Sequence, residues 1–315
     1  MRHLSDLVMP TFIIMGALAI VGWLSFYMNS GLDITDESFY LLQAQWIDNT
    51  VFNNTRFGHY LGIMMRLANH DISLVRILGL FLLAMGCISI AVTGTRYIEA
   101  IHTAQHSRIR VAIIASIAVA GGTLYYGWWL TTPSYNWFVL SCSLFAFALV
   151  FSLSRILYRN SGQAPLINSF AIWIRCAAIS ICIVVCFFCK APSSAALSLL
   201  VCVFLALNLH PSNLFGVLTL MSIIGLSAAI AHLYLFEGGV INYLTTIETS
   251  LYQRNLRDGG SQMLDVLPKF WDGFSSIPSH SLQTLPAAFL CSAIMLPLHI
   301  VRKFRTLSPV LFSVI

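Results

Sequence analysis

The chain has 315 residues, of which 58% are hydrophobic and only 9% are charged, and its formal net charge is +5. Apolar runs recur from one end to the other, and no soluble fold could bury so many hydrophobic side chains. The basic residues form no run and no patch interleaved with aromatic side chains, which argues against a nucleic-acid partner. The composition indicates a multi-pass membrane protein.

The membrane-spanning segments are expected to be helices, because hydrocarbon offers the peptide backbone no hydrogen-bond partner. We therefore expect an all-α fold, a polytopic transmembrane helix bundle that forms a single membrane domain over residues 1–315. The first apolar run is too long for a signal-peptide core and is interpreted as an uncleaved span. Eight stretches have the length that a bilayer requires: 7–28, 72–95, 109–128, 135–157, 170–189, 193–209, 214–236 and 284–303.

The distribution of charge predicts the orientation, since Lys and Arg accumulate in short cytoplasmic loops. With the N-terminus in the cytoplasm, ten of the twelve acidic residues fall in outer segments, and the inner segments are mainly basic. This predicts a protein of the inner (plasma) membrane whose active face is periplasmic or otherwise extracytoplasmic. Two long loops, 29–71 and 237–283, lie on that face, and loops of such length usually bind or react with something.

Each outer loop has features of its own. Residues 57–70, FGHYLGIMMRLANH, are too short and too polar to span, and their apolar positions recur with a helical period. We expect an amphipathic helix in the membrane interface. Its apolar stripe would hold Tyr60, Ile63, Met64 and Leu67, and another face would hold His59, Arg66 and His70. In the second loop, Gly-Gly and Pro separate short amphipathic pieces, which is typical of a folded cap.

Three acids fall within the stretch GLDITDESFYLL, residues 31–42, directly after the first span. In a helix, Asp33, Asp36, Glu37 and Tyr40 would share one face, because they are spaced at i, i+3, i+4 and i+7. One interpretation is structural: Asp33 caps a juxtamembrane helix, and the next two acids complement its dipole. The other interpretation is a functional site, and this stretch by itself does not separate them.

Two further stretches place polar groups at the outer boundary. In WWLTTPSYNW, Tyr135 and Asn136 begin the fourth span beside tryptophans that suit an interfacial belt. In VCFFCKAPSS, Lys190 ends the fifth span where a lipid phosphate would lie. A lysine that extends its ammonium toward the interface is the simpler account of that residue taken singly.

Taken together, these three stretches resemble motifs of a known class of membrane enzymes. GLDITDESFYLL resembles the acidic first-loop motif of membrane glycosyltransferases of the GT-C class, which use polyprenyl-phosphate-linked sugars. That class includes the family 39 protein O-mannosyltransferases and the lipid A aminoarabinose transferases, and its members are typically longer than this chain. TPSYNW and FFCKAPSS are similar to stretches of bacterial members of the same superfamily.

The resemblance implies an integral membrane glycosyltransferase, with Asp36 matching the family's catalytic acid and Glu37 beside it. The implied donor is a sugar on an undecaprenyl-type phosphate, and the acceptor is a lipid, glycan or protein on the outer face. Membrane lipids would surround the bundle. The sequence leaves open which sugar is moved and whether a divalent metal assists; no other cofactor is expected.

The chemistry of such a transfer gives each candidate residue a role. The acceptor hydroxyl needs a base, for which Asp36 is the candidate, and direct attack would invert the anomeric centre. The departing phosphate needs cations, for which we select Lys190, Arg254 and Arg257. The predicted substrate-binding set is Asp33, Tyr40, Tyr135, Asn136, Lys190, Arg254 and Arg257.

Two other functions stay open. A transporter or a lipid or polysaccharide flippase, without glycosyl transfer, should carry charged residues within several spans. A non-catalytic membrane scaffold is the third reading. Arg175 and His232 are polar residues inside predicted spans, and the sequence assigns no role to either.

Overall fold

The computed structural model describes residues 2–29, 36–45, 55–102, 107–129, 132–159 and 169–257. The chain divides into two compact units, Met1–Leu251 and Tyr252–Ile315. The described part of the second unit is only the end of one helix, so the architecture below is that of the first unit. Throughout the described ranges every regular element is a helix, which confirms the predicted all-α bundle.

The long helices agree with the predicted spans. Within the described ranges, seven helices are long and apolar enough to cross a membrane. They are α1 (Arg2–Phe26), α4 (Ile72–His102), α5 (Arg108–Trp129), α6 (Tyr135–Arg159), α7 (Phe170–Cys189), α8 (Ala191–Asn208) and α9 (Pro211–Phe236). The largest difference is at α4, which continues past residue 95 to His102. The eighth predicted span, 284–303, lies outside the described residues.

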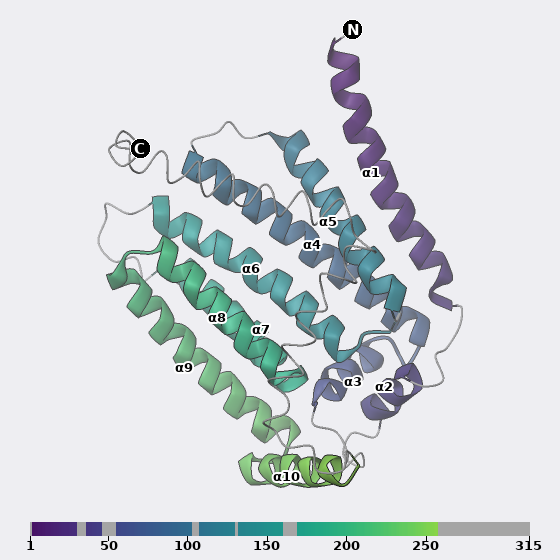
Figure 1. The fold of residues 1–315 in the computed structure, drawn as a ribbon, viewed down its shortest axis with the longest axis vertical. Coiled ribbons are helices and arrows are strands. Elements are labelled where there is room, and N and C mark those ends of the chain that lie inside the picture. Colours follow the sequence, from purple (N-terminus) through teal and green to yellow (C-terminus); the bar gives the residue numbers. More distant parts are fainter. Residues whose placement is uncertain are drawn as a thin grey trace, which may run out of the picture. The chain divides into compact units, whose positions relative to one another are not determined.

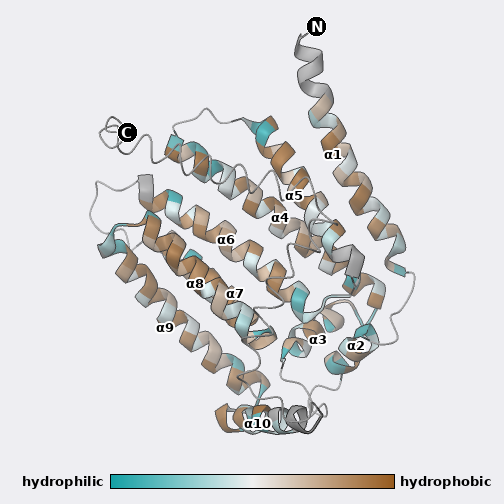
Figure 2. Ribbon diagram, viewed as in Figure 1, coloured by the Kyte–Doolittle hydropathy of each residue, from teal (hydrophilic) through white to brown (hydrophobic). Residues whose placement is uncertain are grey.

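These seven helices pack side by side (Figure 1). Helix α4 packs against α5 and α6, α7 packs against α6, α8 and α9, and α1 packs against α5. Figure 2 shows that the long helices are predominantly hydrophobic. A helix that is apolar around most of its circumference belongs in a protein core or in lipid, and many large apolar side chains here are exposed on the bundle. The protein is therefore a multi-pass membrane protein.

Helix α7 lies at the centre of the main apolar core. Ile172, Cys176 and Ile179 of this helix are fully buried, against Val201 of α8 and Val217 of α9. A second core forms where short helices meet the ends of α4, α6 and α7. This second core determines where the polar residues of one end of the bundle lie.

The short elements are η1 (Tyr27–Asn29), α2 (Asp36–Gln45), α3 (Phe57–Leu67) and α10 (Val240–Arg257). Helices α2 and α3 pack against each other, and they approach so closely that a Cβ atom on Gly62 would lie 2.8 Å from the carbonyl oxygen of Ala44. A helix does form at the predicted interfacial segment. On this helix Leu67 is 76% exposed, whereas His59 is buried.

Candidate functional site

The candidate site lies at the end of the bundle where the two predicted outer loops meet. An ion pair of 2.7 Å joins Arg56 Nη2, just before α3, to Glu237 Oε2, just after α9. The backbone amide of Arg56 also donates to the carbonyl oxygen of Phe188, near the end of α7, at 2.7 Å. Segments far apart in the sequence are thereby held together, and three groups of polar side chains gather around them.

The first group, the Glu237 cluster, consists of Arg56, His59, Tyr60, His232 and Glu237. Besides its ion pair with Arg56, the Glu237 carboxylate accepts a hydrogen bond from His59 Nε2 at 3.0 Å. Tyr60 Oη lies 3.1 Å from His232 Nδ1, while Nε2 of the same imidazole is 3.8 Å from Glu237 Oε1. All the charged and imidazole side chains of the cluster are buried.

The electrostatics of the cluster follow from this geometry. Burial opposes ionisation of Glu237, but His232, His59 and Arg56 beside its carboxylate outweigh that cost and lower its pKa to about 2. Burial raises the pKa of Tyr60, so its hydroxyl keeps its proton where it lies 3.1 Å from His232 Nδ1.

The two glycines that follow Glu237 explain its position at the end of α9. Helix α9 ends at Phe236, and Gly238 and Gly239 follow with φ values of +68° and +124°. Glycine adopts such angles without steric cost, so the chain can turn sharply while the amides of Glu237 and Gly239 both bond to the carbonyl oxygen of Leu233. The carboxylate is fixed at the helix end.

The second group is a buried ion pair between α2 and α4. Arg76 donates from Nε and Nη2 to Glu37 Oε1, at 3.0 and 2.8 Å, and from Nη1 to the carbonyl oxygen of Met28 at 2.7 Å. The hydroxyl of Thr132 donates to the same Glu37 oxygen. Each of the side chains of Glu37, Arg76 and Thr132 is almost completely buried. Glu37 therefore ties the acidic stretch to the first turns of α4 and to the segment that precedes α6.

The third group, the aromatic–lysine cluster, brings together four of the predicted site residues. The rings of Tyr40 and Tyr135 meet edge to face with their centroids 6.1 Å apart, and Phe57 contacts both. Lys190 Nζ lies 5.5 Å from the centroid of the Tyr135 ring and donates to Asn136 Oδ1 at 3.1 Å. These four residues therefore lie close together, and their role in binding a substrate stays a prediction.

Helix ends position this third group. Ser134 precedes α6, and its hydroxyl accepts a hydrogen bond from the Trp137 amide at 3.3 Å, as an N-cap residue does. Tyr135 and Asn136 are consequently in the first turn of α6. Lys190 is the single residue between α7 and α8, and its extended backbone reverses the chain.

Asp36 differs from its neighbour Glu37. It is the first residue of α2 and is exposed, and it precedes Tyr40 by four residues, so the two lie on the same helix face. Among the described residues, none forms a hydrogen bond or ion pair with its carboxylate. The remaining predicted residues are not located: Asp33 lies outside the described residues, and so do the side chains of Arg254 and Arg257, whose backbone forms the end of α10.

Sequence reasoning missed Arg56, Arg76 and the role of Glu237. Arg76 could have been found, because an arginine inside an apolar run is expected to be paired or functional. His232 was recognised as an intramembrane polar residue, and its partners come from α3 and the end of α9. No sequence spacing indicates these partners.

No metal site is found in the part of the chain that the structure describes, since none of its His, Cys, Asp and Glu side chains form a group of three suited to an ion. Comparisons with protein-family models, with curated proteins and with solved structures give no match. The fold and the site therefore define a class, a multi-pass helical membrane protein with a polar, aromatic-lined end.

Proposed function

We propose that this chain is an integral membrane glycosyltransferase, which moves a sugar from a polyprenyl phosphate donor to an acceptor on the extracytoplasmic face with inversion. One observation carries the proposal: an exposed carboxylate, Asp36, lies one helical turn from Tyr40, which packs against the tyrosine that Lys190 covers. A base and a cation thus share one end of the bundle, connected by aromatic rings.

The chemistry assigns a part to each group. Asp36 takes the proton of the acceptor hydroxyl as that oxygen attacks the anomeric carbon, and the bond to the donor phosphate breaks. The Lys190 ammonium stabilises the charge of the departing lipid phosphate. Tyr135 is partly exposed and offers a ring suited to a sugar, whereas Tyr40 is buried and supports that ring edge to face. Glu37 has a positioning role in this scheme, since Arg76 and Thr132 occupy its carboxylate and fix the first turn of α2.

The position of the buried charges favours this proposal over a transporter. A transport pathway should carry charged residues along the interior of several spans. Here Arg76 and His232 bond with groups from segments at the end of the bundle. Arg175 lies in the second turn of α7 and donates to Ser152 Oγ and the carbonyl oxygen of Ala171. Each of these three residues lies close to the end of its span.

The test is the variant Asp36→Asn, assayed in proteoliposomes with a panel of labelled polyprenyl phosphate sugars and the membrane fraction as acceptor. Loss of the base should lower transfer by about a hundredfold or more, with unchanged insertion and thermal stability. Glu248→Gln, which removes an exposed carboxylate from α10, is the matched control and should keep full activity. Undiminished transfer by Asp36→Asn would refute the assignment of the base.

A further inference from the structure

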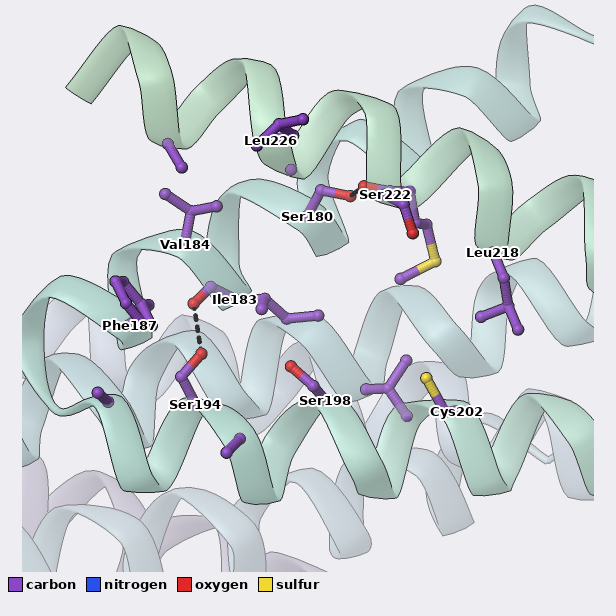
Figure 3. A pocket seen from close by; sticks show the side chains of 16 residues that line it. Ser180, Ile183, Val184, Phe187, Ser194, Ser198, Cys202, Leu218, Ser222 and Leu226 are labelled. Carbon is purple, nitrogen blue, oxygen red and sulfur yellow. Dashed lines mark hydrogen bonds between the residues drawn. The ribbon is translucent and has the colours of Figure 1, made fainter. Parts of the chain in front are cut away.

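A groove lies between α7, α8 and α9 (Figure 3). Its volume is about 570 Å³, within the range of sites that hold a small molecule. Helix α7 packs against both of the other helices, whereas α8 and α9 make few contacts with each other. Helix α7 is therefore the floor of the groove, and α8 and α9 are its walls.

Small side chains explain why this space is open. Ser194 and Ser198 of α8 face Ser222 and Gly225 of α9, and Figure 3 shows the serines lining the space between the helices. The hydroxyl of Ser194 donates to the carbonyl oxygen of Ile183 at 2.9 Å, and that of Ser180 donates to the carbonyl oxygen of Met221 at 2.9 Å. With these hydroxyls bonded to helix carbonyls, the groove presents a mostly apolar lining.

The depth of the groove matches one leaflet. Along α8 its lining runs from Ala191, the first residue of the helix, to Cys202. At 1.5 Å per residue this is about 16 Å, roughly half of a hydrocarbon core of about 30 Å. The groove thus begins at the boundary marked by Lys190 and ends near the middle of the membrane, which suits one hydrocarbon chain of one leaflet.

A basic residue, Lys190, lies next to the shallow end of the groove. Lys190 follows Phe187 by one helical turn and directly precedes Ala191, both of which line the groove. An apolar channel with a cation at the interface is complementary to a lipid with an anionic headgroup.

We propose that the isoprenoid chain of a polyprenyl phosphate lies in this groove, with its phosphate at the Lys190 ammonium. The identity of the lipid rests on the proposed function, and the location of its chain rests on the groove. A single channel takes a single chain, whereas a diacyl phospholipid would leave its second chain outside. The phosphate would then lie beside Tyr135 and Asn136, at the aromatic–lysine cluster.

The test uses the full chain in phosphatidylcholine nanodiscs and geranylgeranyl phosphate that carries a diazirine at the end of its chain. After irradiation, we expect labelled peptides from the deep end of the groove, around Cys202 and Leu218. Ser198→Phe and Ser222→Phe should each reduce labelling about tenfold, because the ring occupies the space of the chain. Leu199→Phe, at an exposed neighbouring position outside the groove, should label as the unmodified protein does.

Two further measurements distinguish a polyprenyl phosphate site from a general lipid site. Lys190→Gln should weaken labelling by the phosphate about fivefold and leave labelling by the neutral alcohol geranylgeraniol unchanged. Label outside the groove, or full labelling of Ser198→Phe, overturns the proposal. Equal competition by dioleoyl phosphatidic acid also overturns it, in favour of a general phospholipid site. Because the assay measures binding, Asp36→Asn should label normally, so a failure of the catalytic proposal leaves this result unaffected.

Discussion

Arg56 and Glu237 form an ion pair of 2.7 Å in which both side chains are buried, although one residue precedes α3 and the other follows α9. Breaking the pair would leave a buried charge without its partner, which costs far more than an exposed pair contributes. The contact therefore fixes α3 to the end of α9 and makes the Glu237 cluster a structural centre of this end of the bundle.

The low pKa of Glu237 predicts a stability that depends on pH. Its folded-state value of about 2 is below the ordinary value of 4.5, so the carboxylate stabilises the fold fully above pH 4.5 and loses that contribution as the pH falls toward 2. Measured by thermal unfolding, the free energy of unfolding that the unmodified protein has in excess of Glu237→Gln should be larger by about 3 kcal/mol at neutral pH than near pH 2. The difference should shrink between pH 4.5 and 2, and a constant difference would contradict the assignment.

The ion pair of Glu37 and Arg76 predicts strong coupling between two substitutions. Glu37→Gln and Arg76→Met should each lower the free energy of unfolding by about 3–5 kcal/mol, because each leaves one buried charge unpaired. The double variant should lose much less than the sum, and denaturation of the four proteins in one detergent measures the coupling. Additive losses would show that the pair contributes nothing jointly.

At two glycines, the addition of a single methyl group is expected to lower the stability of the fold. A Cβ atom on Gly62 would lie 2.8 Å from the Ala44 carbonyl oxygen, and one on Gly79 would lie 2.7 Å from Cγ of Pro133. Gly62→Ala and Gly79→Ala should therefore destabilise the protein by about 1–3 kcal/mol. Gly22→Ala in α1 is the control, since it meets no atom within 4 Å and should be neutral or stabilising. The measurement is the melting temperature of each variant, and equal values for all three would contradict the prediction.

Substitution of Lys190 is expected to reduce activity and to leave folding intact. If the proposed function holds, Lys190→Gln lowers sugar transfer by about 10–100-fold, because the donor phosphate loses its cation, and the melting temperature stays close to that of the unmodified protein. Arg66→Gln removes an exposed cation from α3 and should leave transfer unchanged. If both variants lose activity equally, general surface charge would explain the effect in place of a specific contact.

The bundle itself could be predicted because the membrane imposes a length on each apolar run. The stretch 170–189 was predicted to span, and α7 has those same bounds. The partners of the helices could not be predicted in this way. Helix α4 is apolar almost all round, so its composition does not indicate which face meets α6, or that Gly79 lies against Pro133.

Sequence reasoning could find the polar residues that lie at the ends of predicted spans. It could not find contacts between residues that are far apart in the sequence. Tyr135 and Lys190 stand out as polar groups at span ends, and they do meet. By contrast, periodicity groups His59 with Arg66 and His70, and it does not indicate the partner of His59, Glu237, which lies 178 residues away in the sequence. Adjacent residues of one motif, Asp36 and Glu37, have opposite surroundings, because the helix turns one outward and the other toward Arg76.

The tight reversal at Lys190 also bears on biogenesis. Its amide donates to the Cys186 carbonyl, and its own carbonyl accepts from the Ser194 amide, so both backbone groups of the one-residue connection belong to the adjoining helices. Because a single residue connects α7 and α8, we expect the two helices to insert into the membrane together as one hairpin. Extra glycines inserted at this point would uncouple their insertion and let one slide against the other.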